Sequence, residues 1–229
     1  MFEHSYERFQ IRYMSGQNTD DLCAWRNSMT TCEERKKIFD ALPKMALSPQ
    51  HVSGAKLIES RLAMLDKLPK GMRVLEVGVA NGGFSVEIWK RISPVYMSLV
   101  DLWEGDRYSQ GYNKVKEIFS KNIADGTVSL NISSSIDFLK NCSENSFDFI
   151  YIDTNHTYWT TIEELVESDR IISRDGFIAG HDYTVGNTIN PMVYGVIQAV
   201  NQFCVENHYK FEYLTVEPAG WNSFCLKRI

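Results

Sequence analysis

The sequence predicts an α/β protein built on a doubly wound, Rossmann-like sheet, and three observations lead to this prediction. From about Arg73 onward, short apolar segments typical of buried strands alternate with segments of helical periodicity. A glycine-rich loop follows the first of these strands, and the second strand ends in an acidic residue, Asp101. A mainly parallel sheet covered by helices on both faces accounts for all three.

Seven segments have the composition of strands, namely 72–78, 96–102, 127–131, 147–153, 176–182, 211–216 and 223–228. Helical patterns lie between them over 84–92, 110–123, 134–141 and 160–172. Asp175-Gly176 is expected to close the last of these as a turn. Pro191 is expected to open one further helix, whose apolar face holds Val193, Val196, Ile197, Val200 and Phe203.

The first part of the chain differs from the rest. Residues 1–52 hold helical fragments such as CEERKKIFDAL and breaks at Pro43 and Pro49, so we expect a helical arm before a domain of residues 53–229. Two roles are open for this arm. It either packs against the domain or acts as a lid or a dimer contact. In the case of a dimer contact, the protein would be a homo-oligomer.

Composition excludes several classes of protein. The net charge is −5, and the basic run Arg35-Lys36-Lys37 directly follows Glu33-Glu34, as on a solvated helix face, so no nucleic-acid partner is expected. No apolar run is long enough to span a membrane, and the N-terminus lacks the pattern of a signal peptide. The 5 cysteines are scattered without a CxxC pair, which favours free thiols and a cytoplasmic location.

The glycine-rich loop has the pattern ExGxxxG, formed by Glu76, Gly78 and Gly82. A dinucleotide fingerprint would need GxGxxG, and the register Gly78, Ala80, Gly83 lacks its middle glycine. A carboxylate at this strand end would repel a pyrophosphate but would suit a ligand with an ammonium group. The alternative is a structural turn without a ligand.

Two later positions extend this candidate binding site. Asp101 lies about 20 residues beyond the loop, where an acid can bind both hydroxyls of a ribose. Trp103 is placed to stack on an adenine, although an aromatic residue after a strand is more often part of the core. Ser133 and Ser134 follow the third strand and either face the base or cap the next helix.

The segments LEVGVANGGFS, VDLW, YIDTNHTY and GHDY, together with the serine loop, resemble class I S-adenosylmethionine-dependent methyltransferases. The resemblance is strongest to the small-molecule branch that contains macrocin-like and aminocoumarin sugar O-methyltransferases, and it covers Ser53 to Ile229. It implies a seven-stranded sheet with an antiparallel last strand. It also implies Glu76, Gly78 and Gly82 around the methionine moiety, Asp101 on the ribose, and Ser133 or Ser134 near the adenine.

Polar residues also follow the fourth and fifth strands, and the carboxyl ends of neighbouring strands meet at one edge of such a sheet. We therefore expect Asp153, Asn155, His156, His181 and Asp182 to converge. The resemblance implies that Asp153, His181 and Asp182 hold Mg²⁺ or another divalent cation. In that family an acid is usual at the position of His181, and a further aspartate is frequent at the position of Asn155. An imidazole ligand shifts the metal preference of the site toward transition metals.

The expected reaction is methyl transfer to a hydroxyl of a small acceptor, such as a sugar or a glycosylated metabolite. The catalytic candidates are Asp153, His156 as the base, and His181 as the alternative base if it does not bind the cation. Two other functions stay open. One is a methyltransferase-like binding module without activity, and the other is an N-methyltransferase, although the Asn/Asp-Pro-Pro-Tyr motif frequent in that group is missing.

Overall fold

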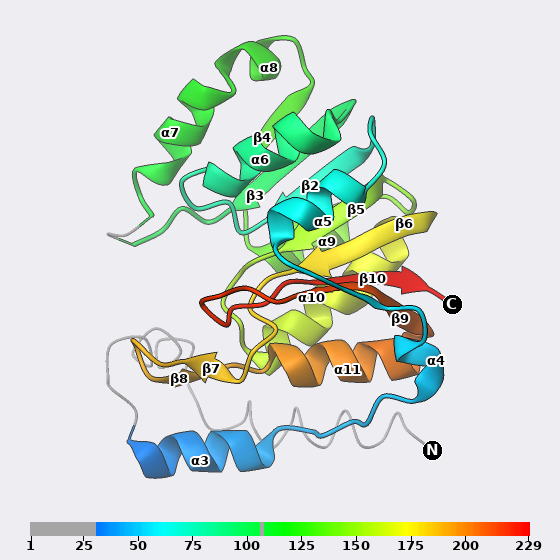
Figure 1. Cartoon of the computed structure of the whole chain (residues 1–229). Helices are drawn as coiled ribbons and strands as arrows, with labels where there is room; N and C mark the ends of the chain where they lie inside the picture. Colours follow the sequence, from blue (N-terminus) through cyan, green and yellow to red (C-terminus); the bar gives the residue numbers. More distant parts are fainter. Residues whose placement is uncertain (1–30, 106–107) are drawn as a thin grey trace.

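Eight strands form one sheet in the computed structural model, which describes residues 31–105 and 108–229 (Figure 1). Their order across the sheet is β1-β9-β10-β6-β5-β2-β3-β4. Their bounds are β1 (Lys56–Ile58), β2 (Arg73–Val77), β3 (Tyr96–Asp101), β4 (Val128–Ile132), β5 (Phe147–Ile152), β6 (Ile172–Gly180), β9 (Tyr209–Thr215) and β10 (Phe224–Arg228).

The direction of the strands confirms the predicted fold class. Strands β4, β3, β2, β5 and β6 pair in parallel, whereas β10 is antiparallel to both of its neighbours, β6 and β9. The predicted count of seven strands is wrong, because β1 adds a parallel partner outside β9. Strand β1 has 3 residues, two of them exposed, so it gives no apolar run that the sequence could reveal.

Helices cover both faces of the sheet (Figure 1). One core cluster lies under α5 (Arg61–Lys67), α6 (Gly83–Ile92), α7 (Gly111–Ile118) and α8 (Ser120–Ala124), and the other under α9 (Ser135–Asn141), α10 (Tyr158–Ile171) and α11 (Val196–Asn207). Strand β5 contributes to both. Phe149 and Tyr151 face the first cluster, and Ile150 and Ile152 face the second, as the two-residue period of a strand requires.

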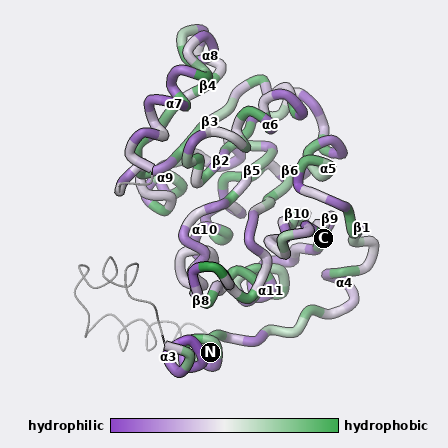
Figure 2. The backbone as a smooth tube through the Cα atoms, turned by 60° about the vertical axis from the view of Figure 1, so that its left-hand side comes forward, coloured by the Kyte–Doolittle hydropathy of each residue, from purple (hydrophilic) through white to green (hydrophobic). Residues whose placement is uncertain are grey.

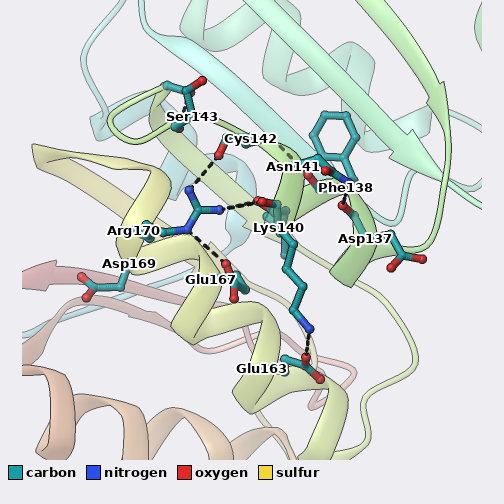
Figure 3. A network of polar contacts seen from close by, with 12 residues as sticks. Asp137, Phe138, Lys140, Asn141, Cys142, Ser143, Glu163, Glu167, Asp169 and Arg170 are labelled. Carbon is teal, nitrogen blue, oxygen red and sulfur yellow. Dashed lines mark hydrogen bonds and ion pairs between the residues drawn. The ribbon is translucent and has the colours of Figure 1, made fainter.

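Helices α9 and α10 are joined by polar contacts at the C-terminal end of α9 (Figure 3). The Arg170 guanidinium donates to the carbonyl oxygens of Cys142 at 2.7 Å and Leu139 at 2.8 Å. Lys140 and Glu163 form an ion pair of 2.6 Å between the same two helices. The Arg170 bonds add a donor to carbonyl groups at the C-terminal end of α9. They fix the position of α10, whose first turn follows the loop after β5.

Two details of the predicted secondary structure are wrong. Pro191 does not open a helix: it lies between β7 (Gly186–Asn187) and β8 (Met192–Val193), which form a hairpin, and α11 starts at Val196. The Asn187 side chain accepts the N–H groups of Ile189 and Asn190, and this local bonding turns the chain before Pro191. Asp175-Gly176 lies inside β6, where the pairing with β5 shifts register instead of ending.

Part of the predicted N-terminal arm lies outside the described residues, namely 1–30. The described part holds α3 (Cys32–Ala41) and α4 (Pro49–Val52). Helix α3 contributes no buried residue and lies at the periphery beside the β7–β8 hairpin, as Figures 1 and 2 show. The role of the arm as packing element, lid or dimer contact therefore stays a prediction. No helix of the described segments is long and apolar enough to cross a membrane.

A salt bridge joins β2 and β5 at the end of the sheet opposite their carboxyl ends. Asp148 accepts two hydrogen bonds from the Arg73 guanidinium, at 2.8 and 3.0 Å, and one from the Arg73 N–H at 2.9 Å. These bonds lower the pKa of the Asp148 carboxyl to about 2. The paired geometry fixes the relative position of two central strands.

We predict that Asp148→Asn lowers the free energy of unfolding by about 1 kcal/mol at pH 7, because the pair is partly exposed and partly screened. A lowered folded-state pKa stabilises the protein above the unfolded pKa of about 3.9, and this stabilisation is lost as pH falls toward 2. Urea unfolding of wild type and variant at pH 7 and near pH 2 measures the difference, which should shrink at the lower pH. Asp40→Asn, in an exposed ion pair with Lys36, is the control. Equal effects of the two substitutions would contradict the prediction.

Candidate active site

The carboxyl ends of β2, β5 and β6 lie side by side. The Asp153 N–H donates to Val77 O at 2.8 Å, and the His181 N–H donates to Ile152 O at 3.0 Å. Gly78 has a φ of +90°, and a Cβ there would lie 1.9 Å from the Asp153 carbonyl oxygen. Only glycine therefore lets the glycine loop and the end of β5 come together. The sequence signal of Gly78 reflects this backbone contact.

Glu76 is buried at the end of β2, with 1% of its surface exposed, and its Oε2 has no hydrogen-bond partner among the described residues. Burial raises the pKa of its carboxyl to about 8, Ser85 beside it lowers the pKa, and the charge of Asp153 raises it further. Arg61 lies near enough for its positive charge to act in the opposite direction. An unpaired buried carboxyl is costly, and a bound ammonium group would supply the missing partner.

The glycine loop leads into α6 without a side-chain cap. Gly82 is the N-cap residue with a φ of +76°, and a Cβ there would lie 2.9 Å from Val115 Cγ2, so this glycine lets α7 pack closely. A Cβ at Gly83 would meet nothing within 4 Å. Gly83, the first residue of α6, thus borders open space at the positive end of the helix.

Asp101 binds the glycine loop itself. Its Oδ2 accepts the N–H groups of Val79 and Ala80, both at 2.8 Å, and its Oδ1 accepts the Trp103 N–H at 2.8 Å. The carboxylate keeps capacity for a ribose hydroxyl, since each oxygen has two lone pairs. The predicted contact with a ribose stays a prediction, and the loop contacts are a second role that the sequence did not indicate.

Trp103 is part of the core. Its surface is 5% exposed, its indole N–H donates to Ala80 O at 2.8 Å, and its ring contacts the Tyr112 ring edge-on at 5.2 Å between centroids. The enclosed ring offers no open face to an adenine. The expectation that Trp103 stacks on the base is therefore corrected in favour of the core alternative.

The two serines after β4 have local hydrogen bonds. Ser134 is the N-cap of α9, and its hydroxyl accepts the Asp137 N–H at 3.1 Å. Ser133 donates from its hydroxyl to Ser134 O at 3.0 Å, and its N–H donates to Asp101 O. Of the two roles open for these serines, contact with the base or capping of the next helix, Ser134 has the capping role. Ser133 lies next to Asp101, where a contact with the base stays a prediction.

Asp153, His181 and Asp182 lie together, with one donor atom of each within 4.8 Å of the others. Asp182 is the most buried of the three, with 7% of its surface exposed, and its backbone has a positive φ of +58°. Asp182 Oδ1 lies 3.4 Å from His181 Nδ1, and Asp182 Oδ2 lies 3.2 Å from His156 Nε2. Burial raises the pKa of Asp182, but the hydrogen bond from His181 and the nearby positive charges outweigh it, so that pKa is lowered.

His156 is held by the segment that follows the β7–β8 hairpin. Its φ is +61°, its ring lies 4.7 Å from the Tyr194 ring, and its carbonyl accepts the Gly195 N–H at 2.9 Å. A Cβ at Gly195 would lie 2.3 Å from Tyr158 N, so this contact also requires glycine. Tyr194 and Gly195 belong to the site, although their sequence neighbourhood carries no motif.

Asn155 is the exception in the predicted cluster. Its Oδ1 accepts the Thr157 N–H at 3.1 Å, and its Nδ2 donates to Thr160 Oγ1 at 2.9 Å. The amide is thus bonded to the start of α10 rather than to the carboxylates. The expectation that Asn155 converges with the other four residues is corrected, because local bonding at the start of the helix satisfies its side chain.

Arg61 is a site residue that the sequence did not reveal. Its Nη1 lies 3.7 Å from Asp153 Oδ2 and 3.4 Å from Tyr151 Oη, and its guanidinium lies 4.4 Å from the centre of the Phe84 ring. It starts α5, where only the N-cap Ser60 stands out in the sequence. Packing of α5 beside the end of β5 brings Arg61 to Asp153, and no local sequence pattern indicates such a contact.

Residues 75–183 match the family model described as a methyltransferase domain, and this segment runs from the glycine loop through the Asp182 cluster. No curated protein matches the chain by sequence. The match covers less than half of the chain, so the predicted activity, methyl transfer from S-adenosylmethionine, and the small-molecule branch are both proposals.

Solved structures share this fold at low sequence identity. SMU.1697c, a putative methyltransferase from Streptococcus mutans in complex with SAH, has a TM-score of 0.54 and 14% identity over 73% of this chain and 95% of its own. A putative rRNA-methylase from Clostridium thermocellum has a TM-score of 0.55 and 14% identity, over 75% of this chain and 99% of its own. The pyocyanin biosynthetic protein PhzM has a TM-score of 0.54 and 14% identity over 73% of this chain. The match spans 54% of the length of PhzM.

We predict that Glu76→Gln flattens the pH dependence of stability in the ligand-free protein. A folded-state pKa of about 8 means that stability falls as pH rises from about 4.5 to 8, because only the unfolded state loses the proton readily. The neutral amide does not titrate, so it avoids this loss. The free energy of unfolding of the variant, relative to that of wild type, should therefore rise by on the order of 2–3 kcal/mol from pH 5 to pH 8. Urea unfolding across this range is the measurement, with the exposed Glu33→Gln as the control. Parallel curves for wild type and Glu76→Gln would contradict the prediction.

Proposed function

We propose that this protein is an S-adenosylmethionine-dependent O-methyltransferase that acts on a hydroxyl of a small acceptor, such as a sugar or a glycosylated metabolite, with the help of a divalent cation. The observation that carries the proposal is the cluster of Asp153, His181 and Asp182, with His156 on the same carboxylate. The cluster lies at the strand ends next to the glycine loop, where a doubly wound sheet binds its ligands.

The residues of the glycine loop fit the cofactor. The unpartnered Glu76 Oε2 suits the ammonium group of the methionine moiety, and open space lies at Gly83 before the uncapped start of α6. S-adenosylmethionine, when bound, supplies a methyl group on a sulfonium sulfur, which a nucleophilic oxygen displaces in line. The chain must therefore hold the acceptor oxygen on the methyl side of the cofactor and remove its proton.

The donor set of the cluster also fits a divalent cation, because two carboxylates and one imidazole lie within reach of one ion. A bound cation would lower the pKa of an acceptor hydroxyl. Asp153 is the accessible member, with 29% of its side chain exposed. The imidazole of His181 favours a transition metal over Mg²⁺ compared with a site made of carboxylates alone.

His156 is the proposed base. Asp182 Oδ2 lies 3.2 Å from its Nε2, and the Tyr194 ring packs against the imidazole, so the ring is held in one orientation. Nδ1 is then the nitrogen that takes the acceptor proton, and the Asp182 carboxylate stabilises the imidazolium that forms. His181 remains the alternative base if it does not bind the cation.

Isothermal titration calorimetry with S-adenosylhomocysteine and with NAD tests the cofactor. Binding of NAD alone would replace the proposal with a dehydrogenase-like function. Release of S-adenosylhomocysteine across a panel of hydroxylated sugars, glycosylated metabolites and amines then tests the acceptor. Turnover of amines alone would favour an N-methyltransferase, and cofactor binding without turnover of any acceptor would favour a binding module.

We predict that Asp153→Asn and Asp182→Asn each weaken the binding of Mn²⁺ or Zn²⁺ at least tenfold, because each removes one carboxylate donor. Asparagine tolerates the positive φ of Asp182, which keeps the backbone unchanged. Titration of the metal into the protein measures this effect without any acceptor. Asp66→Asn, on α5 beside Arg91, is the control. Unchanged metal affinity in both variants would refute the cation site, as would turnover that survives EDTA.

We predict that His156→Asn lowers kcat by about 100-fold or more on an acceptor found in the panel and leaves the affinity for S-adenosylhomocysteine within about twofold. The residue has a positive φ that asparagine accepts. His208→Asn is a matched control, since His208 also has a positive φ and is exposed at the end of α11. A kcat loss below tenfold would remove His156 as the base.

A further inference from the structure

Glu164 is a buried carboxyl that lies outside the cluster of carboxylates and histidines. It belongs to α10, 0% of its surface is exposed, and its Oε2 accepts a hydrogen bond from Thr154 Oγ1 at 3.0 Å. Its Oε1 has no hydrogen-bond partner in the part of the chain that the structure describes. A buried acceptor without a donor is costly, so a carboxyl at this position needs an explanation.

The surroundings of Glu164 disfavour its charged form. Burial raises the pKa of its carboxyl to about 7, against the opposing effect of the Ser135 and Thr154 hydroxyls. The negative charges of Glu163 and Asp153 raise this pKa further. An apolar side chain of similar volume would avoid the cost of burying the carboxyl. Stability alone therefore does not account for a glutamate at this position.

Other contacts already hold α10 against α9, as Figure 3 shows. Arg170 donates to two carbonyl groups at the end of α9, and Lys140 pairs with Glu163. Glu164 is part of none of these bonds. The packing of the two helices therefore does not depend on its carboxyl.

Thr154 links this carboxyl to the site. It directly follows Asp153, and its backbone N would lie 3.3 Å from a Cβ at Gly78, so it packs next to the glycine loop. With His156 and His181 it also lines a cavity of about 10 Å³, which has room for about one water. A shift of Thr154 would therefore move the end of β5 relative to the groups around it.

Ser135 lies on the other side of Glu164. It is the first residue of α9 and directly follows the N-cap Ser134, in the segment after β4. The Glu164 carboxyl thus lies behind the site, between the end of β5 and the start of α9. A carboxyl has enough lone pairs to accept hydrogen bonds from hydroxyls on both sides.

We propose that Glu164 is a positioning residue, which accepts the Thr154 hydroxyl and thereby anchors Asp153, a donor of the cation cluster, to the start of α9. The inference rests on the proposed function, since it takes Asp153 as a donor to a divalent cation. Glu164 itself contacts no ligand and acts through Thr154. Groups behind the donors of a metal site set its affinity by fixing the donor geometry.

Calorimetry with Mn²⁺ and thermal unfolding at pH 8 test this role. Glu164→Met fills the same space without an acceptor and should weaken Mn²⁺ binding by about fivefold or more. Its Tm should not fall below that of wild type, because a raised pKa makes the glutamate lose stability as pH rises from about 4.5 past 7. Glu164→Gln keeps an acceptor for Thr154 and should bind Mn²⁺ within about twofold of wild type.

The donor of the same bond provides a second variant. Thr154→Val removes the hydroxyl and should weaken Mn²⁺ as much as Glu164→Met, and the double variant should bind no more weakly than either single one. Ser168→Ala is the matched control, since Ser168 is also buried on α10 and its hydroxyl has no partner among the described residues. The affinity of every variant for S-adenosylhomocysteine should stay within about twofold of wild type, because only the end of β5 is affected.

The outcomes separate this inference from the proposed function. Unchanged Mn²⁺ affinity in Glu164→Met would overturn the positioning role, and a lower Tm with unchanged affinity would assign Glu164 to stability alone. Equal losses for Mn²⁺ and S-adenosylhomocysteine would show a general disturbance and also overturn it, as would a Glu164→Gln variant as weak as Glu164→Met. Wild-type protein that binds no Mn²⁺ would overturn the cation site of the proposed function, and this inference with it.

Discussion

The contact between Gly78 and the Asp153 backbone is the constraint on which the rest of the site depends. A side chain at position 78 would overlap the Asp153 carbonyl, so the absence of a Cβ sets the distance between the glycine loop and the end of β5. That distance places the buried Glu76, which faces the proposed cofactor, close to the carboxylate that faces the proposed acceptor. The proposed methyl transfer needs the two substrates in line and within bonding distance, and this backbone contact sets the separation of the two carboxylates before any ligand arrives.

The second feature of the site is an uneven balance of charge. Glu76, Asp153 and Asp182 lie near one another, and burial raises the pKa of the first two. Arg61 and the two histidines offset part of this cost, and Asp182 is stabilised in its charged form by its imidazole neighbours. A site with unpaired buried carboxyl groups destabilises the ligand-free protein. Cationic ligands would relieve that cost, which is a source of binding free energy.

The sequence could predict the features that depend on local pattern. The parallel strands, the glycine loop and the meeting of Asp153, His181 and Asp182 follow from apolar periodicity and from the rule that carboxyl ends share one edge. The antiparallel last strand was implied by the resemblance to class I methyltransferases. The sequence could not separate roles that depend on surroundings. Trp103 became core, and the Asn155 side chain bonds to Thr157 and Thr160 at the start of α10, because bonding partners in the fold determine whether such side chains face a ligand.

By itself, the sequence determined the fold class, the order of the motifs and the chemical type of each strand end, because these depend on residue type and on separations along the chain. Only the tertiary structure decided that Arg61 reaches Asp153, that Tyr194 and Gly195 hold His156, and that β1 completes the sheet. These are contacts between residues far apart in sequence or in segments without a motif. They arise from packing between elements, and packing leaves no periodic or compositional signal in a single chain.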